Sequence, residues 1–339
     1  MELLSIATIC QPGMSDLRNN FMKWNRFLRG FIGIFYIFIS TTVSAYDEPV
    51  VNLGYTSFFD GGPPAGPGLY FQDYLQYYKS NRLNDNQGHR IPLPRTNLDV
   101  TADITQIIYI STHKILGANL GISALVPWLL QARVNDGLGN SVLKAQTGGG
   151  DLFIGPALQF DPIMRAGGKE PLFVQRFEID TVVPIGKHDR NNAINPGSNF
   201  WSLNPYWAAT LWITSKWTSS VRLHYLWNAK NTSPNVSFGP NVSNTQAGQA
   251  VFGDFATDYT ITEQFHLGIN GYFFDQFTDT RANGINISGR RERVWAIGPG
   301  MLLGLTKNQF LFFNVYSEQG ARNRAQGTNF ILRYAVHFK

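Results

Sequence analysis

Apolar and polar residues alternate at every second position over long stretches of the chain. The alternation is clear within residues 114–130, 217–229 and 326–338. Successive side chains of a β-strand point to opposite faces, so this periodicity predicts strands with one apolar and one polar face. Along the whole chain it predicts strands at about residues 69–80, 97–111, 114–130, 150–160, 172–184, 201–214, 217–229, 249–261, 264–276, 292–305, 308–318 and 326–338.

The predicted connections alternate between short turns and long polar loops. Short turns are expected near residues 111–113, 215–216, 262–263 and 306–308, an intermediate one at 161–171, long loops at 81–96, 131–149, 185–200, 230–248 and 277–291, and a moderate loop at 319–325. Outer-membrane barrels join their strands by short periplasmic turns and longer external loops. The sequence therefore predicts an all-β fold, a transmembrane antiparallel outer-membrane β-barrel of about 12 strands over residues 69–339.

Residues 46–68 precede the first predicted strand and end in a Gly/Pro-rich run. Proline supplies no N–H group to a sheet, which disfavours a strand of the barrel wall here. Counting residues 51–59 as a thirteenth strand would also either place one terminus on the external side or break the alternation of loop lengths. We interpret residues 46–68 as a segment outside the wall, lying either in the periplasm or in the lumen as a plug.

Residues 1–45 are interpreted as a signal peptide. Three basic residues within 23–29 precede an apolar stretch, and small residues at 43–45 form a cleavage pattern. The apolar stretch is too short for a comfortable transmembrane helix, although an N-terminal membrane anchor is the alternative. Met22 is an alternative start, which would make residues 1–21 an over-extended one. Cys10 is the only cysteine and lies before the expected cleavage site, so no disulfide is expected in the mature chain.

Charged residues make up only 15% of the 339 residues and aromatic residues 14%. Soluble domains contain about 25% charged residues, so a soluble β-sandwich, the alternative for twelve alternating strands, is disfavoured. The net charge of +5 is small and dispersed, which gives no basis for nucleic-acid binding. Trp201, Trp217 and Trp227 lie near predicted strand ends and are expected to form aromatic girdles against outer-membrane lipid.

Charged residues on the polar faces of the strands are candidates for lining the lumen. In the strand at 172–184, Arg176, Glu178 and Asp180 share one face, and a lipid-facing Arg near the bilayer midplane costs roughly 2–4 kcal/mol. We therefore expect such faces to point inward, where opposed charges either hold the barrel shut or line a polar path. The candidates are Asp99, Asp103, Asp151, Arg176, Glu178, Asp180, Arg222, His224, Asp254, Asp258, His266 and Arg333.

Patterns typical of catalysis are missing from the sequence. It contains no G-x-S-x-G, H-E-x-x-H, C-x-x-C or P-loop motif, and its six histidines are scattered. No enzyme activity, cofactor or metal is expected. An outer-membrane lipid hydrolase would need a serine and a histidine close together on the outer face, whereas His224 and His266 are expected to face inward.

The chain ends in NFILRYAVHFK, residues 329–339, whose apolar residues alternate up to Phe338. We expect this stretch to close the barrel by pairing with residues 69–80, which leaves no unpaired edge in lipid. It also resembles the C-terminal signal read by the barrel-assembly machinery, which favours a terminal aromatic residue. Here Phe338 is the penultimate residue.

Three longer stretches resemble one family of proteins. They are FFDGGPPAGPGLYFQDYLQYY (58–78), TGGGDLFIGPALQF (147–160) and FEIDTVVPIGKHDRNNAINPGSNFWSLNPYWAAT (177–210). They are similar to the outer-membrane proteins named for the meta-pathway of phenol degradation, which include the sphingosine-induced outer-membrane proteins. The resemblance implies an outer-membrane β-barrel that transports aromatic or other hydrophobic compounds, and it implies no particular binding residues.

The leading functional hypothesis is therefore an outer-membrane channel or passive transporter for small hydrophobic or aromatic compounds. A structural or sensory outer-membrane protein with a closed lumen is the alternative, and a lipid hydrolase is the third possibility.

Overall fold

The computed structural model describes residues 47–62, 66–141 and 143–338. The predicted signal peptide lies outside these described residues. Twelve long strands form the barrel wall: β1 (Gly68–Leu83), β2 (Asn97–Ile115), β3 (Ala118–Asn135), β5 (Leu152–Phe160), β7 (Pro171–Val183), β8 (Ser202–Trp212), β9 (Trp217–Asn228), β11 (Ala250–Thr262), β12 (Phe265–Gln276), β15 (Arg293–Thr306), β16 (Gln309–Arg322) and β17 (Ala325–Phe338). Short elements lie between them: β4 (Gly148–Gly149), β6 (Ile163–Met164), η1 (Val236–Phe238), β10 (Thr245–Gln246), β13 (Arg281–Ala282) and β14 (Ile285–Asn286).

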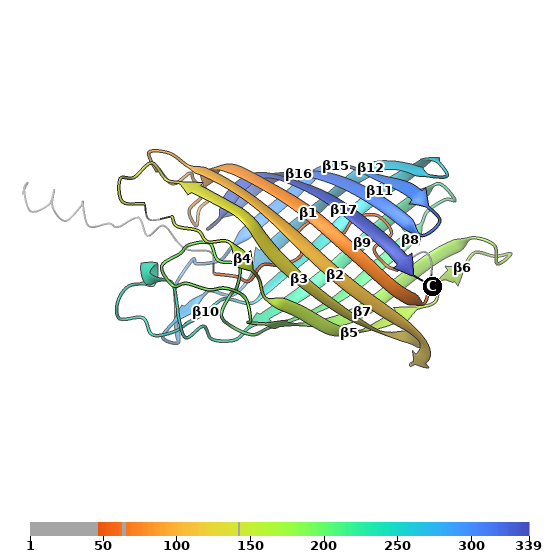
Figure 1. The fold of residues 1–339 in the computed structure, drawn as a ribbon, viewed down its shortest axis with the longest axis horizontal. Helices are drawn as coiled ribbons and strands as arrows, with labels where there is room; N and C mark the ends of the chain where they lie inside the picture. The colour runs from red at the N-terminus through yellow and green to blue at the C-terminus, as the bar shows by residue number, and fades with distance from the viewer. Residues whose placement is uncertain (1–46, 63–65, 142, 339) are drawn as a thin grey trace, which may run out of the picture. The chain divides into compact units, whose positions relative to one another are not determined.

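The sheet is antiparallel and closed (Figure 1). Each long strand pairs with its neighbours in the chain, and β1 pairs with both β2 and β17. The register of the closing pair runs from Leu69 opposite Phe338 to Ser80 opposite Gly327. Both the predicted barrel and the predicted closing strand are confirmed. Within the described part of the chain, no helix is long and apolar enough to span a membrane.

Two predicted connections differ from the observed ones. The first turn falls at Leu116 and Gly117 rather than at residues 111–113, because β2 continues to Ile115. Both turn residues have positive φ, 53° and 80°, which is the backbone geometry that a two-residue hairpin requires. The loop predicted at residues 319–325 is only a tight turn, since β16 and β17 extend into it.

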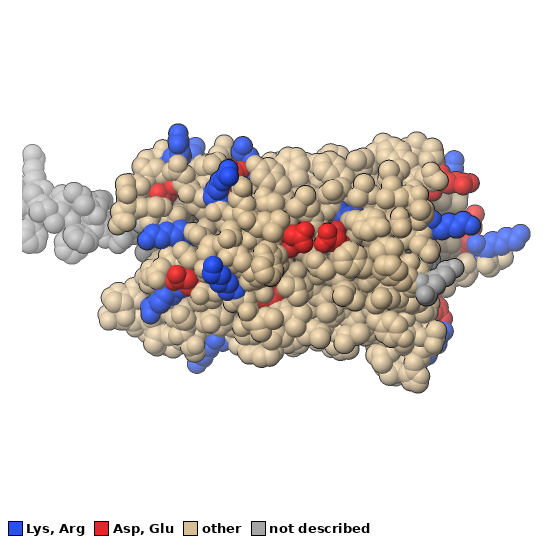
Figure 2. Space-filling view, in the orientation of Figure 1, with Lys and Arg blue, Asp and Glu red and all other residues tan. Residues whose placement is uncertain are grey.

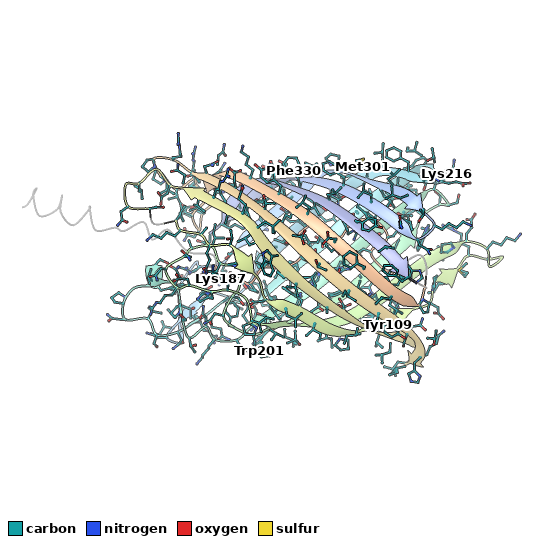
Figure 3. The ribbon with its side chains drawn as sticks, viewed as in Figure 1. Tyr109, Lys187, Trp201, Lys216, Met301 and Phe330 are labelled. Carbon is teal, nitrogen blue, oxygen red and sulfur yellow. The ribbon has the colours of Figure 1, made fainter. Side chains whose placement is uncertain are left out.

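The outer face of the barrel is apolar. Space-filling spheres show a broad band almost without charged side chains, with Lys and Arg gathered at both ends (Figure 2). Trp201, Trp217 and Trp227 are 51%, 44% and 41% exposed on this face. In Figure 3, Trp201 lies toward the end that carries the long loops, where Lys187 is found, and Lys216 lies at the opposite end. We call these the loop end and the turn end. This surface suits a lipid bilayer.

Asp99 and Asp103 lie on the outer face, so their predicted inward orientation is wrong. In β2, Ala102 and Ile104 point inward and are buried, which turns the alternate residues outward. The inner side of β2 is apolar because residues 47–62 pack against it, so the polar face of this strand is its outer one. Figure 2 shows two neighbouring acidic side chains in the middle of the apolar band. In the register of β1 and β2, Asp73 lies opposite Thr105, two residues from Asp103 and near the middle of both strands.

Replacing Asp103 by Leu is expected to stabilise the barrel by about 1 kcal/mol, because a charged side chain on the lipid face near the midplane is unfavourable. Denaturant unfolding in lipid vesicles would measure the change. The matched control is Asp99→Leu. Asp99 lies near the loop end and accepts a hydrogen bond of 2.8 Å from the Tyr77 hydroxyl, so this variant should gain nothing. A stability that falls in Asp103→Leu would contradict the lipid-facing placement.

Residues 47–62, which we call the inner segment, run through the interior of the barrel. They contain no strand, and Val51, Tyr55 and Phe58 are at most 5% exposed. Val51 and Tyr55 belong to the main buried cluster, together with inward-facing residues such as Tyr272 and Tyr316. Eight strands give an interior that side chains just fill, so a twelve-stranded barrel has space for such a segment.

Candidate functional site

The middle of the inner segment is held by hydrogen bonds to the barrel wall. The Asp254 carboxylate on β11 accepts bonds from the Gly54 amide, at 2.7 Å, and from the Thr56 hydroxyl, at 2.8 Å. The Tyr316 hydroxyl on β16 donates to the Gly54 carbonyl, at 2.8 Å. Gly54 has φ +84°, and a Cβ atom there would lie 2.6 Å from the Tyr316 ring. Only glycine fits this position, which fixes the path of the segment.

A buried ion pair anchors the end of the inner segment. Arg222 Nε on β9 donates to Asp60 Oδ2 at 2.8 Å, and the two side chains are 11% and 5% exposed. The Arg222 guanidinium also lies 4.3 Å from the centroid of the Tyr206 ring. The next amide, that of Gly61, donates to Thr210 Oγ1 at 2.9 Å. Losing either partner of such a pair would leave a buried charge uncompensated, so the contact strongly favours the seated segment.

Arg176 and Glu178 on the inward face of β7 form a buried ion pair. Arg176 Nε donates to Glu178 Oε2 at 2.8 Å, and the Tyr206 hydroxyl donates to the same oxygen at 2.6 Å. Arg176 and Glu178 are 4% and 2% exposed, and Asp180 lies on the same inward face. Opposed charges in this part of the lumen therefore form closed contacts rather than lining an open aqueous path.

The two predicted histidines also lie on inward faces. His224 Nδ1 lies 2.9 Å from Asn204 Oδ1, and the imidazole stacks on Phe252 with ring centroids 4.2 Å apart. His266 Nδ1 lies 2.9 Å from a carboxylate oxygen of Asp258 on the adjacent strand. Each histidine thus has a partner on the wall. In the described residues, no group of three or more His, Cys, Asp or Glu side chains could hold a metal ion.

Asp151 is buried, but it lies in the loop region before β5 rather than on the lumen wall. Its carboxylate accepts hydrogen bonds from the Gly186 amide at 2.9 Å and from the Ser198 amide at 2.7 Å. Asp151 therefore joins two stretches at the loop end. The prediction that Asp151 lines the lumen is therefore wrong, and its carboxylate orders the loops instead.

Acidic residues hold the start of the inner segment at the loop end. Asp47 is paired with Arg290, whose Nη2 lies 2.8 Å from Asp47 Oδ1, and Glu48 accepts a bond of 2.7 Å from Asn228. Burial and the nearby Glu292 carboxylate raise the pKa of Glu48. Burial raises the pKa of Glu292 from 4.5 to about 7. A buried carboxyl with a raised pKa binds its proton more tightly than in water, so docking here weakens as pH rises through about 7.

Cavities lie on both sides of the inner segment. A cavity of about 310 Å³ near the loop end is lined by Val51, Tyr55 and Leu98, among others. A cavity of about 350 Å³ near the turn end is lined by Phe58, Phe312 and Arg333, among others. These two cavities share no lining residue. A third cavity of only about 30 Å³ shares Tyr55 with the first and Arg222 with the second, so the seated segment leaves a narrow gap between them.

The partners of the inner segment were not identified from the sequence. Asp60 precedes a Gly/Pro-rich run, and nothing local in the sequence marks it as the partner of Arg222. Tyr74 and Tyr316 also face inward and are almost fully buried. Their alternation with outward-facing neighbours predicts that they point inward. It does not predict their contacts with the inner segment, which is distant in sequence.

A profile of the family described as "Putative MetA-pathway of phenol degradation" matches residues 80–334. No curated protein sequence matches the chain. The fold is similar to the crystal structure of the COG4313 outer membrane channel from Pseudomonas putida F1, with 16% identity, 85% of this chain and 100% of that chain covered, and a TM-score of 0.69. At this identity the likeness establishes the fold, that of an outer-membrane barrel.

Two further solved barrels are more distant. The KdgM porin has 10% identity, with 80% of this chain and 99% of that chain covered and a TM-score of 0.40. The Ralstonia pickettii toluene transporter TbuX has 10% identity, with 81% and 90% covered and a TM-score of 0.38. TM-scores this low say nothing about the solute that this chain binds.

Proposed function

Since the chain belongs to the family described as "Putative MetA-pathway of phenol degradation", we propose that it is an outer-membrane channel or passive transporter for small hydrophobic or aromatic compounds. The family description names the degradation of an aromatic compound. The interior of the barrel supports the proposal because aromatic side chains such as Tyr74, Phe252 and Phe274 are buried there.

The observation that carries the proposal is the pair of cavities separated by the inner segment. Their volumes, about 310 and 350 Å³, are typical of small-molecule sites, which measure roughly 300–1,000 Å³. The only cavity found to border both has a volume of about 30 Å³ within the described residues, too small for an aromatic ring, so a solute can pass between the main cavities only if the inner segment moves. The inner segment is then the gate of the channel.

A closed-lumen structural or sensory protein is the second candidate. The buried pair between Asp60 and Arg222 favours it, because a permanently seated segment would leave no path. The lipid-hydrolase alternative has less support, since His224 and His266 lie on inward faces, away from lipid. We therefore propose a transporter that has no enzymatic role.

Uptake of radiolabelled benzyl alcohol and benzoate across the outer membrane distinguishes the two leading candidates. Cells that lack the protein are compared with the same cells carrying it. Faster accumulation of either solute in the complemented cells is expected. Equal rates for both solutes, with the protein present in the outer membrane, would favour the closed-lumen protein.

A further inference from the structure

The cavity at the turn end combines an aromatic lining with one buried arginine side chain that lacks a carboxylate partner among the described residues. Phe58 and Phe59 of the inner segment, Trp212 of β8, and Phe310 and Phe312 of β16 all line it. Its volume of about 350 Å³ is in the range of small-ligand sites. Aromatic walls of this kind favour a flat ring, which gains from stacked and edge-to-face contacts.

The charged group is Arg333 of β17, which also lines this cavity. Arg333 is 5% exposed, and its guanidinium carbon lies 3.6 Å from the centroid of the Phe312 ring. Its Nε has no hydrogen-bond partner. Among residues 47–62, 66–141 and 143–338, no carboxylate lies within ion-pair distance of this guanidinium. A buried cation without a counter-ion is unfavourable, and an anion in the cavity would relieve that cost.

The other arginine side chains around the cavity already have carboxylate partners. Arg222 is paired with Asp60, and Arg176 is paired with Glu178. Of the two histidines that line the cavity, His266 contacts the Asp258 carboxylate, and His337 lies with Nε2 3.2 Å from the Pro67 carbonyl oxygen. Glu263 also lines the cavity, but it is exposed in the turn between β11 and β12 and is therefore solvated. The uncompensated charge that faces the cavity is therefore positive and belongs to Arg333.

We propose that this cavity binds a small aromatic carboxylate, with its ring among the aromatic side chains and its carboxylate on the Arg333 guanidinium. A guanidinium presents a planar fork of donors that matches a carboxylate in a bidentate fashion. The inference rests on the proposed function and narrows its solutes to aromatic acids. Neutral aromatic molecules fill the same space but leave the buried cation unpaired, so they bind more weakly.

The test is the binding of benzoate to the full chain in detergent micelles, followed by tryptophan fluorescence and by calorimetry. Trp212 lines the cavity and supplies an optical signal. Benzyl alcohol has the same ring without the charge, and acetate has the charge without the ring. We expect benzoate to bind at least about tenfold more tightly than either, because hydrogen bonds to charged groups are the strong ones.

Variants of Arg333 distinguish an effect of its charge on binding from an effect of the substitution on folding. In Arg333→Gln, benzoate affinity should fall by about tenfold or more while benzyl alcohol affinity is unchanged. In Arg333→Lys, which keeps the charge but loses the fork, benzoate affinity should be intermediate. Heat-dependent mobility on a denaturing gel checks that each variant forms the barrel.

Equal affinity of the wild type for benzoate and benzyl alcohol would overturn the inference, and so would unchanged benzoate binding in Arg333→Gln. Either result would leave the proposed channel in place, because neutral aromatic solutes would still bind. If cells with the protein take up neither benzoate nor benzyl alcohol faster than cells without it, the proposed function itself is contradicted.

Discussion

Deleting residues 48–61 is expected to convert the barrel into a pore that conducts ions steadily in a planar bilayer. These residues occupy the lumen, and the two main cavities lie on either side of them. Without them, the wall retains its continuous ladder of strand pairs, because the segment adds no strand to the sheet. The wild type should show only small or rare current steps, since its segment is held by the Asp60–Arg222 pair and by Asp254.

The control deletion removes residues 166–168, which lie in the connection between β5 and β7 and do not line either main cavity. It should leave the conductance at the wild-type level. Adding a synthetic peptide of residues 47–62 to the first deletion should reduce its current, because the peptide carries the side chains that bind the wall. Wild-type conductance in the first deletion would mean that another element closes the lumen.

The barrel itself could be predicted because its signals are local. The alternation along each strand and the length of each connection depend only on residues that are close together in the sequence. The even number of strands follows from them. The positions of Asp99 and Asp103 show where this reasoning fails. It assumes that the apolar face meets lipid, but in β2 the apolar residues Ala102 and Ile104 meet the inner segment instead. Once a lumen is filled by an apolar segment, polarity alone no longer distinguishes inside from outside.

The contacts that close the lumen could not be predicted in the same way. Asp60 and Arg222 are separated by 162 positions, and Gly54 and Asp254 by 200. Such pairs depend on the path of the inner segment, which has no strand periodicity to reveal it. That Arg333 meets no carboxylate among the described residues is likewise a property of the assembled barrel. The alternation of β17 indicates that Arg333 points inward, but only the packed interior shows that, in the part of the chain that the structure describes, no carboxylate meets it.

Movement of the inner segment during transport can be prevented by a disulfide. Asn314 Nδ2 on β16 lies 3.2 Å from Ser57 Oγ on the segment, and both residues are almost fully buried. We expect cysteines at both positions to tether the segment to the wall when oxidised, provided that the two Cα atoms approach within about 7 Å, the limit for a disulfide. Cys10, the only natural cysteine, lies in the predicted signal peptide, so no competing thiol is expected in the mature chain.

The decisive measurement is the rate at which cells carrying the Ser57→Cys/Asn314→Cys protein accumulate radiolabelled benzoate, before and after reduction with dithiothreitol. The two single-cysteine variants serve as controls, and mass spectrometry verifies that the disulfide has formed. If the segment is a gate that must move, uptake should fall to that of cells lacking the protein when the disulfide is present, and should recover on reduction. Equal uptake in the oxidised and reduced states, above that of cells lacking the protein, would contradict the account.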